Sequence, residues 1–169
     1  MPEIAIADTG PLVHLAEIGE AGQLDIFDAV IVTEQVNVEL IRHGVGARIA
    51  ETLGNRFRVS SVSRSEMRTK LAELSRLRLH RADISTAALA ARVKPDVVLT
   101  DDLRLRKALE SQGFLVVGSI GVVFRALRLG RLGKRDAINR LDQLLDDSSL
   151  YASKAFRVSV RKILDEYPG

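Results

Sequence analysis

The sequence predicts an α/β protein in which a central parallel sheet of about five strands lies between two layers of helices, with a helical extension at the C-terminus. Three observations support this fold class. Short apolar runs rich in β-branched residues recur along the first 117 residues. Stretches with helical periodicity separate these runs, and such alternation is typical of a parallel sheet covered on both faces. The sequence after the last run has only helical patterns.

The predicted strands are short and are bounded by turn or capping residues. They occupy residues 4–7, 30–32, 57–59, 97–99 and 115–117. Their length and their β-branched content favour buried strands over buried helices, which need about ten residues or more.

Two predicted helices between these strands have distinct signals. Ser63 and Glu66 have the spacing of a capping box, in which each side chain bonds the other residue's backbone at a helix N-terminus. The apolar residues that follow recur at helical spacing, at Met67, Leu71 and Leu74. A second stripe, at positions 84, 87, 88 and 91, predicts an alanine-rich helix before the fourth strand.

The C-terminal part has two apolar stripes that follow the i, i+4, i+7, i+8 rule of amphipathic helices. Their members are Ala137, Leu141, Leu144 and Leu145 in the first and Phe156, Val160, Ile163 and Leu164 in the second. Gly130 and Gly133 separate these stripes from the preceding apolar run. We therefore divide the chain into an α/β domain, residues 1–130, and a helical annex, residues 131–169, packed on the same domain.

The amino-acid composition indicates the cellular compartment in which we expect the protein. The 169 residues include no cysteine, which excludes disulfide frameworks, thiolate metal sites and cysteine nucleophiles and is typical of a reducing compartment. The N-terminus lacks the basic segment of a secretory signal, and the longest nearly apolar stretch, residues 113–124, is shorter than the ~20 residues that a membrane span needs. We therefore expect a cytoplasmic protein without a membrane partner.

The two parts of the chain carry opposite net charge. Residues 1–60 contain 4 arginines and 9 acidic residues, whereas residues 61–169 contain 21 lysines and arginines and 13 acidic residues. The basic part is compatible with a phosphate-bearing partner, although solvated helix surfaces explain the excess equally well. No platform for base stacking is visible among the seven aromatic residues, so a nucleic acid would be held mainly by its backbone.

Four acidic residues lie in four different segments that follow the predicted strands or begin the predicted helices. Asp8 follows the first strand, and Asp102 follows the fourth. Glu39 lies about one and a half turns into the helix after the second strand, and Asp83 lies near the start of the alanine-rich helix. Because ligands bind at the carboxyl ends of strands in an open parallel sheet, we expect the four acids to meet there. Taken singly, each aspartate could instead cap a helix, and Glu39 could be solvated or contact His43.

A set of four neighbouring carboxylates needs protons or cations. Two carboxylates about 5 Å apart repel by roughly 3 kcal/mol at an effective dielectric constant of about 20, so six pairs would cost about 20 kcal/mol. That exceeds the ~5–15 kcal/mol net stability of a domain. Oxygen-only ligands favour Mg²⁺ or Mn²⁺. Such an ion beside a basic surface predicts phosphodiester hydrolysis, because it activates water and neutralises charge on the phosphoryl oxygens.

Other catalytic motifs do not fit. Residues 118–121 have the wrong glycine offset for a nucleophile elbow. The segment 128–135 has Arg135 where a phosphate-binding loop has Ser or Thr, and residues 44–46 lack the third glycine of a dinucleotide site. Three histidines have no metal-ligand spacing and are predicted to be structural or solvated: His14, His43 and His80.

Four segments occur in the order found in PIN-domain proteins. They are residues 6–12 (IADTGPL), 36–40 (VNVEL), 79–83 (LHRAD) and 98–102 (VLTDD). The chain therefore resembles the PIN-domain family, in particular a prokaryotic PIN-like group related to VapC-type toxins and described as predicted nucleic-acid-binding proteins. The resemblance covers roughly residues 4–130. It implies a three-layer α/β/α fold and an acidic site that binds Mg²⁺ or Mn²⁺ and cleaves RNA.

The resemblance also implies roles for individual residues. The catalytic and metal-binding acids would be Asp8, Glu39, Asp83 and Asp102, with Asp101 as an additional metal-binding acid and Thr9 and Thr100 as supporting hydroxyls. The family pattern places the fourth acid two residues after a threonine, which selects Asp102, yet the adjacent Asp101 could substitute. Two positions depart from the related group: Thr33 stands where a proline is common, and Ser85 where a second acid is expected. The second departure leaves the number of bound metal ions open.

We therefore expect a metal-dependent endoribonuclease, with arginines or lysines of residues 61–135 contacting the RNA backbone. If the protein is the toxin of a toxin–antitoxin pair, the resemblance implies a homodimer and a small cognate antitoxin that blocks the site. The alternative is a non-catalytic PIN-like module that binds nucleic acid or protein and keeps the acids as helix caps. A phosphotransfer domain fits less well, because Asp8 is followed by Thr9 and lacks the Asp-x-Asp pattern.

Overall fold

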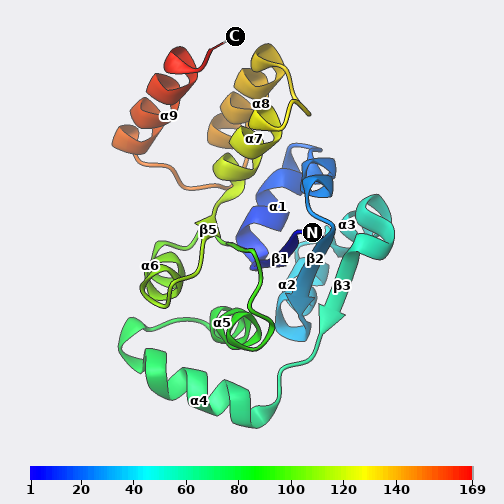
Figure 1. Cartoon of the computed structure of the whole chain (residues 1–169), viewed down its shortest axis with the longest axis vertical. Helices are drawn as coiled ribbons and strands as arrows, with labels where there is room; N and C mark the ends of the chain where they lie inside the picture. The colour runs from blue at the N-terminus through cyan, green and yellow to red at the C-terminus, as the bar shows by residue number, and fades with distance from the viewer. Residues whose placement is uncertain (169) are drawn as a thin grey trace.

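The structure is a computed structural model that describes residues 1–168, and it contains a five-stranded, all-parallel sheet between layers of helices (Figure 1). The strands are β1 (Ile4–Ala7), β2 (Ala29–Thr33), β3 (Phe57–Ser60), β4 (Val97–Leu99) and β5 (Val116–Val117). Their order in the sheet is β3-β2-β1-β4-β5. The predicted fold class is confirmed, and each predicted strand is present with its ends shifted by at most one residue.

The chain crosses between the two halves of the sheet at its centre. β1 lies between β2 and β4, so that Ile6 pairs with Ile31 on one side and with Val98 on the other. The segments after β1 and β4 therefore leave the sheet side by side, and the backbone N–H of Asp8 donates to the carbonyl of Leu99 at 2.8 Å. In open α/β sheets, ligands bind at this kind of switch point.

Helices cover both faces of the sheet. One face packs against α1 (Thr9–Glu17), α2 (Glu34–Arg42), α3 (Gly46–Leu53) and α7 (Ser119–Arg128), together with the 3-10 turn η1 (Ala21–Ile26). The other face packs against α4 (Arg64–Leu74), α5 (Arg81–Val93) and α6 (Leu103–Ser111). Shorter 3-10 turns are η2 (Gly54–Arg56) and η3 (Ser75–Leu77). Because side chains alternate along a strand, Ala5 and Ala7 join the first core and Ile6 joins the second.

The predicted helix signals are confirmed for α4 and α5. The side chain of Ser63 accepts from the backbone N–H of Glu66, and the Glu66 carboxylate accepts from the backbone N–H of Ser63 at 2.7 Å. In α5, residues 82–90 are all buried, because the helix lies between the sheet and α4.

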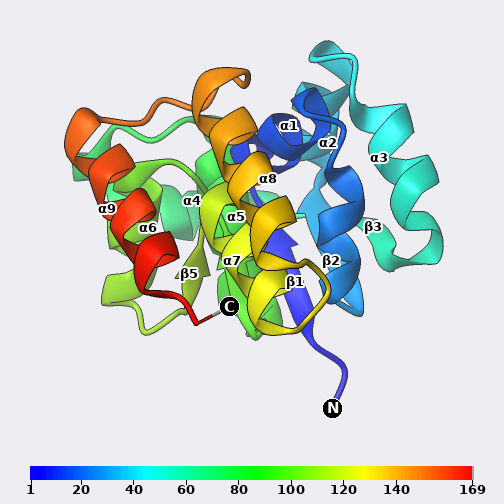
Figure 2. The same cartoon turned by 90° about the horizontal axis from the view of Figure 1, so that it is seen from above.

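The C-terminal helices differ in how they pack. α8 (Lys134–Asp146) lies against α7 and buries its whole predicted stripe. α9 (Lys154–Glu166) buries only Val160 and Leu164, whereas Phe156 is 45% exposed and Ile163 is 51% exposed. The predicted helix is present, but only half of its apolar stripe is buried, and the exposed half faces a cleft. Figure 2 shows α9 beside α8, and an ion pair of 2.6 Å between Arg157 and Asp146 joins the two helices.

Within the described part of the annex, residues 131–168, these contacts place α8 and α9. The division of the chain into residues 1–130 and residues 131–169 stays a prediction. Within residues 1–168, no helix combines the length and the apolar character that crossing a membrane requires.

Candidate metal centre at the carboxyl ends of the strands

A cleft of about 1130 Å³ opens at the carboxyl ends of β1 and β4. All four acids that the sequence singled out line it, and we call them the acidic cluster: Asp8, Glu39, Asp83 and Asp102. They come from the end of β1, from α2, from the first turn of α5 and from the start of α6. The structure therefore brings together residues that are up to 94 positions apart in the chain.

Asp8 is the most buried member of the acidic cluster, with 5% exposure. It occupies the N-cap position of α1, but its side chain makes no capping hydrogen bond. Instead, its Oδ2 accepts a hydrogen bond of 3.0 Å from the hydroxyl of Thr100. Burial, and after it repulsion from Asp83 and Glu39, raises the pKa of Asp8 to about 7, against the hydrogen bonds from Thr9 and Thr100 that lower it. Helix capping therefore does not explain Asp8.

Asp83 has both a structural and an electrostatic role. It is the third residue of α5, and its Oδ2 accepts from the backbone N–H of His80 at 2.8 Å, which completes a capping box. Burial raises the pKa of Asp83 above its usual range, and repulsion from Asp102 and Glu39 acts in the same direction. Oδ2 of Asp83 thus stabilises the start of α5, and the same carboxyl group is still repelled by Asp102 and Glu39.

Glu39 and the two predicted supporting threonines form the inner wall of the cluster. Val36 and Leu40 on the same helix are buried in the core, which directs the half-buried Glu39 toward the cleft. The hydroxyl of Thr9 donates to Oε2 of Glu39, as the hydroxyl of Thr100 does to Asp8. Both hydroxyls therefore hold carboxylates of the acidic cluster in place.

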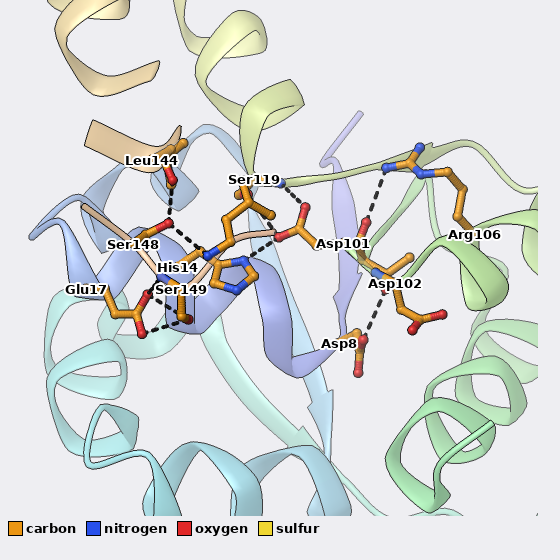
Figure 3. Close-up of polar contacts among 12 residues, drawn as sticks. Asp8, His14, Glu17, Asp101, Asp102, Arg106, Ser119, Leu144, Ser148 and Ser149 are labelled. Atoms are coloured by element: carbon orange, nitrogen blue, oxygen red, sulfur yellow. Dashed lines mark hydrogen bonds and ion pairs between the residues drawn. The ribbon is translucent and has the colours of Figure 1, made fainter. Parts of the chain in front are cut away.

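Two consecutive acids at the end of β4 point in different directions (Figure 3). Asp102 is exposed, and its Oδ1 caps α6 by accepting from the backbone N–H of Leu105 at 2.8 Å. Asp101 turns toward α1 and α7, where its Oδ1 accepts from the backbone N–H of Ser119 at 2.8 Å. Its Oδ2 accepts from the Ser119 hydroxyl at 2.9 Å and lies 2.7 Å from Nδ1 of His14.

The second of these environments, which we call the cap cluster, consists of Asp101, His14 and Ser119. Gly118 occupies the N-cap position of α7 and has no side chain, so Asp101 supplies the missing cap from another connection. A Cβ atom at Gly118 would lie 2.4 Å from Oδ1 of Asp101, so only glycine leaves room for this carboxylate. The prediction that His14 is structural agrees with its contact, but neither its partner nor Ser119 was identified from the sequence.

Thr33 and Ser85, the two residues that differ from the related PIN-like group, contact each other. The hydroxyls of Thr33 and Ser85 are 2.7 Å apart, and both residues are fully buried. Since the Ser85 hydroxyl donates to the carbonyl of Ala82 at 2.7 Å, the Thr33 hydroxyl is the donor of the pair. The same Thr33 oxygen accepts from the backbone N–H of Val36 and so caps α2. A neutral hydroxyl pair thus joins α2 to α5 beside the acidic cluster.

No ion pair within residues 1–168 compensates the charge of the acidic cluster, and only His80 lowers the pKa of Asp83 by its charge. None of its four carboxylates forms an ion pair with a lysine, arginine or histidine of this part of the chain. No three metal-ligating side chains of the described residues converge closely enough to complete a coordination sphere. The donor set nevertheless fits a hard divalent cation, because it consists of carboxylate oxygens around a buried and uncompensated carboxyl group.

Comparisons with known proteins place the chain in a family. A search of curated protein sequences finds no match. Among solved structures, the chain is similar to VapC20 of Mycobacterium tuberculosis, described as a toxin that cleaves the sarcin–ricin loop, with 19% identity over 62% of this chain and 94% of that chain and a TM-score of 0.49. The family model DUF3368, described as a PIN domain, matches residues 4–166. The chain therefore belongs to this PIN-domain family.

Proposed function

We propose that this protein is a Mg²⁺- or Mn²⁺-dependent endoribonuclease that hydrolyses RNA phosphodiester bonds. The observation that carries the proposal is the acidic cluster, in which four carboxylates share one open cleft without a cationic partner among residues 1–168. Such a cluster is costly unless it binds protons or cations. Membership of the PIN-domain family supports a nuclease over other users of divalent cations.

Asp8, Glu39, Asp83 and Asp102 would hold the cation, directly or through water. A divalent ion bound there lowers the pKa of a coordinated water and neutralises charge that develops on the phosphoryl oxygens. The chain's own contribution is to fix the carboxylates: the hydroxyl of Thr100 positions Asp8, and the backbone N–H of His80 positions Asp83. We assign Asp101 to the cap cluster, because its oxygens are already occupied by three hydrogen-bond partners.

The biological setting that we propose is a cytoplasmic toxin of a toxin–antitoxin pair. VapC20 is described as a toxin, and the resemblance of this chain to VapC-type toxins makes the same setting a hypothesis for it. The small antitoxin and the homodimer that the resemblance implies stay predictions.

One observation favours a second candidate, a non-catalytic module that binds nucleic acid or protein. Asp83 and Asp102 both make capping hydrogen bonds, so two of the four acids have structural roles that need no metal. If capping is their only role, the presence of Asp83 and Asp102 does not imply catalysis. Metal binding separates the two candidates, because caps alone give no affinity for a divalent cation.

The test is thermal unfolding and RNA cleavage of the wild type beside Asp8→Asn, each in EDTA, Mg²⁺ and Mn²⁺. A metal at 100 times its Kd adds ~2.7 kcal/mol of stability, or roughly 5 to 10 °C in Tm for a chain of this size. We expect this shift and metal-dependent cleavage in the wild type, with both lost in Asp8→Asn and activity reduced by about 100-fold or more.

Glu51→Gln is the matched control, since Glu51 is an exposed acid outside the cleft. This variant should keep the wild-type shift and activity. A wild type that shows no metal-dependent shift would refute the metal centre and leave the binding module as the better candidate. A shift without cleavage of any RNA would refute the nuclease alone.

A further inference from the structure

The cleft has a second compartment beyond the acidic cluster, and the C-terminal helix α9 forms one of its walls. Its apolar lining comes from α7, β5 and α9: Val117, Ile120, Phe124, Phe156, Val160 and Ile163. The whole cleft, at about 1130 Å³, exceeds the ~300–1,000 Å³ of ordinary small-molecule sites. A bound divalent ion needs only a small part of this space, so the rest of the cleft is open to a larger ligand.

Tyr151 stands at the mouth of this compartment. It lines the cleft and is nevertheless 89% exposed, so the protein gives it almost no packing partner. Its neighbour Ser149 anchors the connection between α8 and α9, because the Ser149 backbone N–H and hydroxyl both donate to the carboxylate of Glu17, at 2.7 and 2.9 Å. Figure 3 shows this anchor beside the cap cluster. The aromatic ring is therefore held near the cleft on a fixed connection.

Phe156 continues the same surface. It lies on the first turn of α9, lines the cleft and is 45% exposed. Two exposed aromatic rings beside an apolar pocket match the surface on which unpaired nucleobases stack, because every base has an apolar face that such rings can cover.

Three unpaired cations favour a polyanionic occupant. Arg81, Arg104 and Lys154 are exposed, and each directly follows in the chain a residue that lines the cleft, namely His80, Leu103 and Ser153. Within residues 1–168, none of these three side chains forms a hydrogen bond or an ion pair. Arginines elsewhere, such as Arg92, Arg125 and Arg157, are held by acidic partners. Free cations beside an acidic centre suit a phosphate chain that passes over the rim.

We infer that α9 and its preceding connection form a nucleobase-binding subsite, in which Tyr151 and Phe156 stack an unpaired base of the strand whose phosphate lies at the acidic cluster. This inference rests on the proposed function for the location of that phosphate, and the family resemblance does not include it. The subsite selects single-stranded RNA over a duplex, because a paired base is buried in its own stack and unstacking costs a few kcal/mol. Recognition by stacking tolerates different bases.

The test measures RNA binding in an Asp8→Asn background, so that cleavage does not interfere. Three fluorescein-labelled probes are compared by fluorescence anisotropy: a short single-stranded RNA, its duplex, and the same strand with abasic residues. Tyr151→Ala and Phe156→Ala should each weaken binding of the single strand by roughly 10-fold, since stacking contributes ~1–3 kcal/mol per base. Binding of the duplex and the abasic strand should change little.

Two variants control for indirect effects. Tyr151→Phe keeps the ring and should bind like the parent protein. Val158→Ala removes an exposed apolar residue of α9 that does not line the cleft, and it should also be neutral. Because Tyr151 is almost fully exposed, its replacement leaves the fold intact.

Three results would overturn the subsite. They are unchanged single-strand binding in both alanine variants, an equal loss with the abasic strand, and a changed sedimentation of the RNA-free alanine variants relative to the parent protein. The last result would assign the two aromatic residues to contacts with a second copy of the chain. The metal-induced shift in Tm is measured without RNA, so failure of the subsite leaves the metal centre to be judged separately. Binding that depends on Tyr151 without any cleavage would keep the subsite and refute the nuclease.

Discussion

The acidic cluster and the cap cluster lie on either side of the same chain segment, at the end of β4. They differ in the number of hydrogen-bond donors around Asp8 and Asp101. Asp101 in the cap cluster contacts three polar groups: the backbone N–H and the hydroxyl of Ser119, and Nδ1 of His14. Asp8 in the acidic cluster has one side-chain donor, Thr100, and two nearby acids that repel it. At one sheet edge, Asp101 is thus structural because several donors are directed at it, whereas Asp8, with fewer donors and two repelling acids, remains available to a cation.

The largest expected difference between the clusters is in the pH dependence of stability. The pKa of Asp8 is about 7 in the metal-free folded state and 3.8 in the unfolded chain, so the folded state holds the extra proton between these values. Stability of the metal-free protein therefore falls as the pH rises from about 4 to about 7. Asp8→Asn lacks this loss and should be more stable than the wild type by roughly 4 kcal/mol at pH 8 in EDTA.

Urea unfolding of both proteins in EDTA from pH 4 to pH 8 measures this difference. The stability difference should vanish near pH 4 and reach its full size above pH 7. Comparing the two proteins cancels the contributions of titrating groups that do not interact with Asp8. Mn²⁺ at 100 times its Kd should reduce this difference at pH 8 by ~2.7 kcal/mol, because only the ionised wild-type carboxylate binds the ion. A difference that does not change with pH would mean that Asp8 is ionised and compensated in the folded protein.

The contrast between the clusters also marks how much the sequence can predict. The strands and the acidic cluster follow from local patterns, because three of the acids lie just after a strand or in the first turn of a helix and Glu39 lies on the helix after β2. Parallel strands bring those positions to one edge of the sheet. The cap cluster does not follow from such rules. His14 and Asp101 are 87 positions apart, and Asp101 stands in for a cap that α7 lacks. Only the crossing of α1, α7 and the β4–α6 connection places these groups together.

The exposed face of α9 was missed for a related reason. Phe156 and Ile163 have the spacing of a buried stripe, and periodicity alone does not distinguish a core from a cleft. Likewise, Tyr151 lies in a connection without periodicity, so no pattern indicates that it stands beside the acidic cluster.

Replacing each of the two acids at the end of β4 by alanine should give opposite results: Asp101→Ala mainly lowers stability, and Asp102→Ala mainly lowers the metal-induced shift in Tm. Asp101→Ala leaves a backbone N–H, a hydroxyl and an imidazole without an acceptor, which costs about 2–3 kcal/mol, but it should keep the metal-induced shift in Tm. Asp102→Ala loses only a helix cap, about 1 kcal/mol, and should lose most of the metal-induced shift.

Chemical denaturation in EDTA and thermal shifts with Mn²⁺ provide the two readouts. Loss of the metal shift in Asp101→Ala, with retention in Asp102→Ala, would exchange the two assignments and make Asp101 the fourth acid.

A smaller effect is expected when the cap cluster is crowded without removing any of its groups. In Gly118→Ala, the new Cβ would lie 2.4 Å from Oδ1 of Asp101, so the carboxylate must move, at a cost of about 1–3 kcal/mol. Gly133→Ala is the matched control, since Gly133 is also a helix N-cap with negative φ and has no atom within 4 Å of a Cβ placed there. Equal stability of the two variants in urea unfolding would show that the cap cluster adapts without cost.

The smallest effect is expected at the hydroxyl pair beside the acidic cluster. Ser85→Ala removes the acceptor of the Thr33 hydroxyl, while the cap that Thr33 gives to Val36 remains, so we expect a loss of about 1 kcal/mol. Thr33→Ser keeps both hydrogen bonds and should cost less. Because neither hydroxyl bonds a carboxylate of the acidic cluster, the Mn²⁺-induced shift in Tm should be unchanged in both variants. A reduced shift in Ser85→Ala would mean that a neutral contact between α2 and α5 helps to set the spacing of Glu39 and Asp83, and that the metal centre depends on more than its four acids.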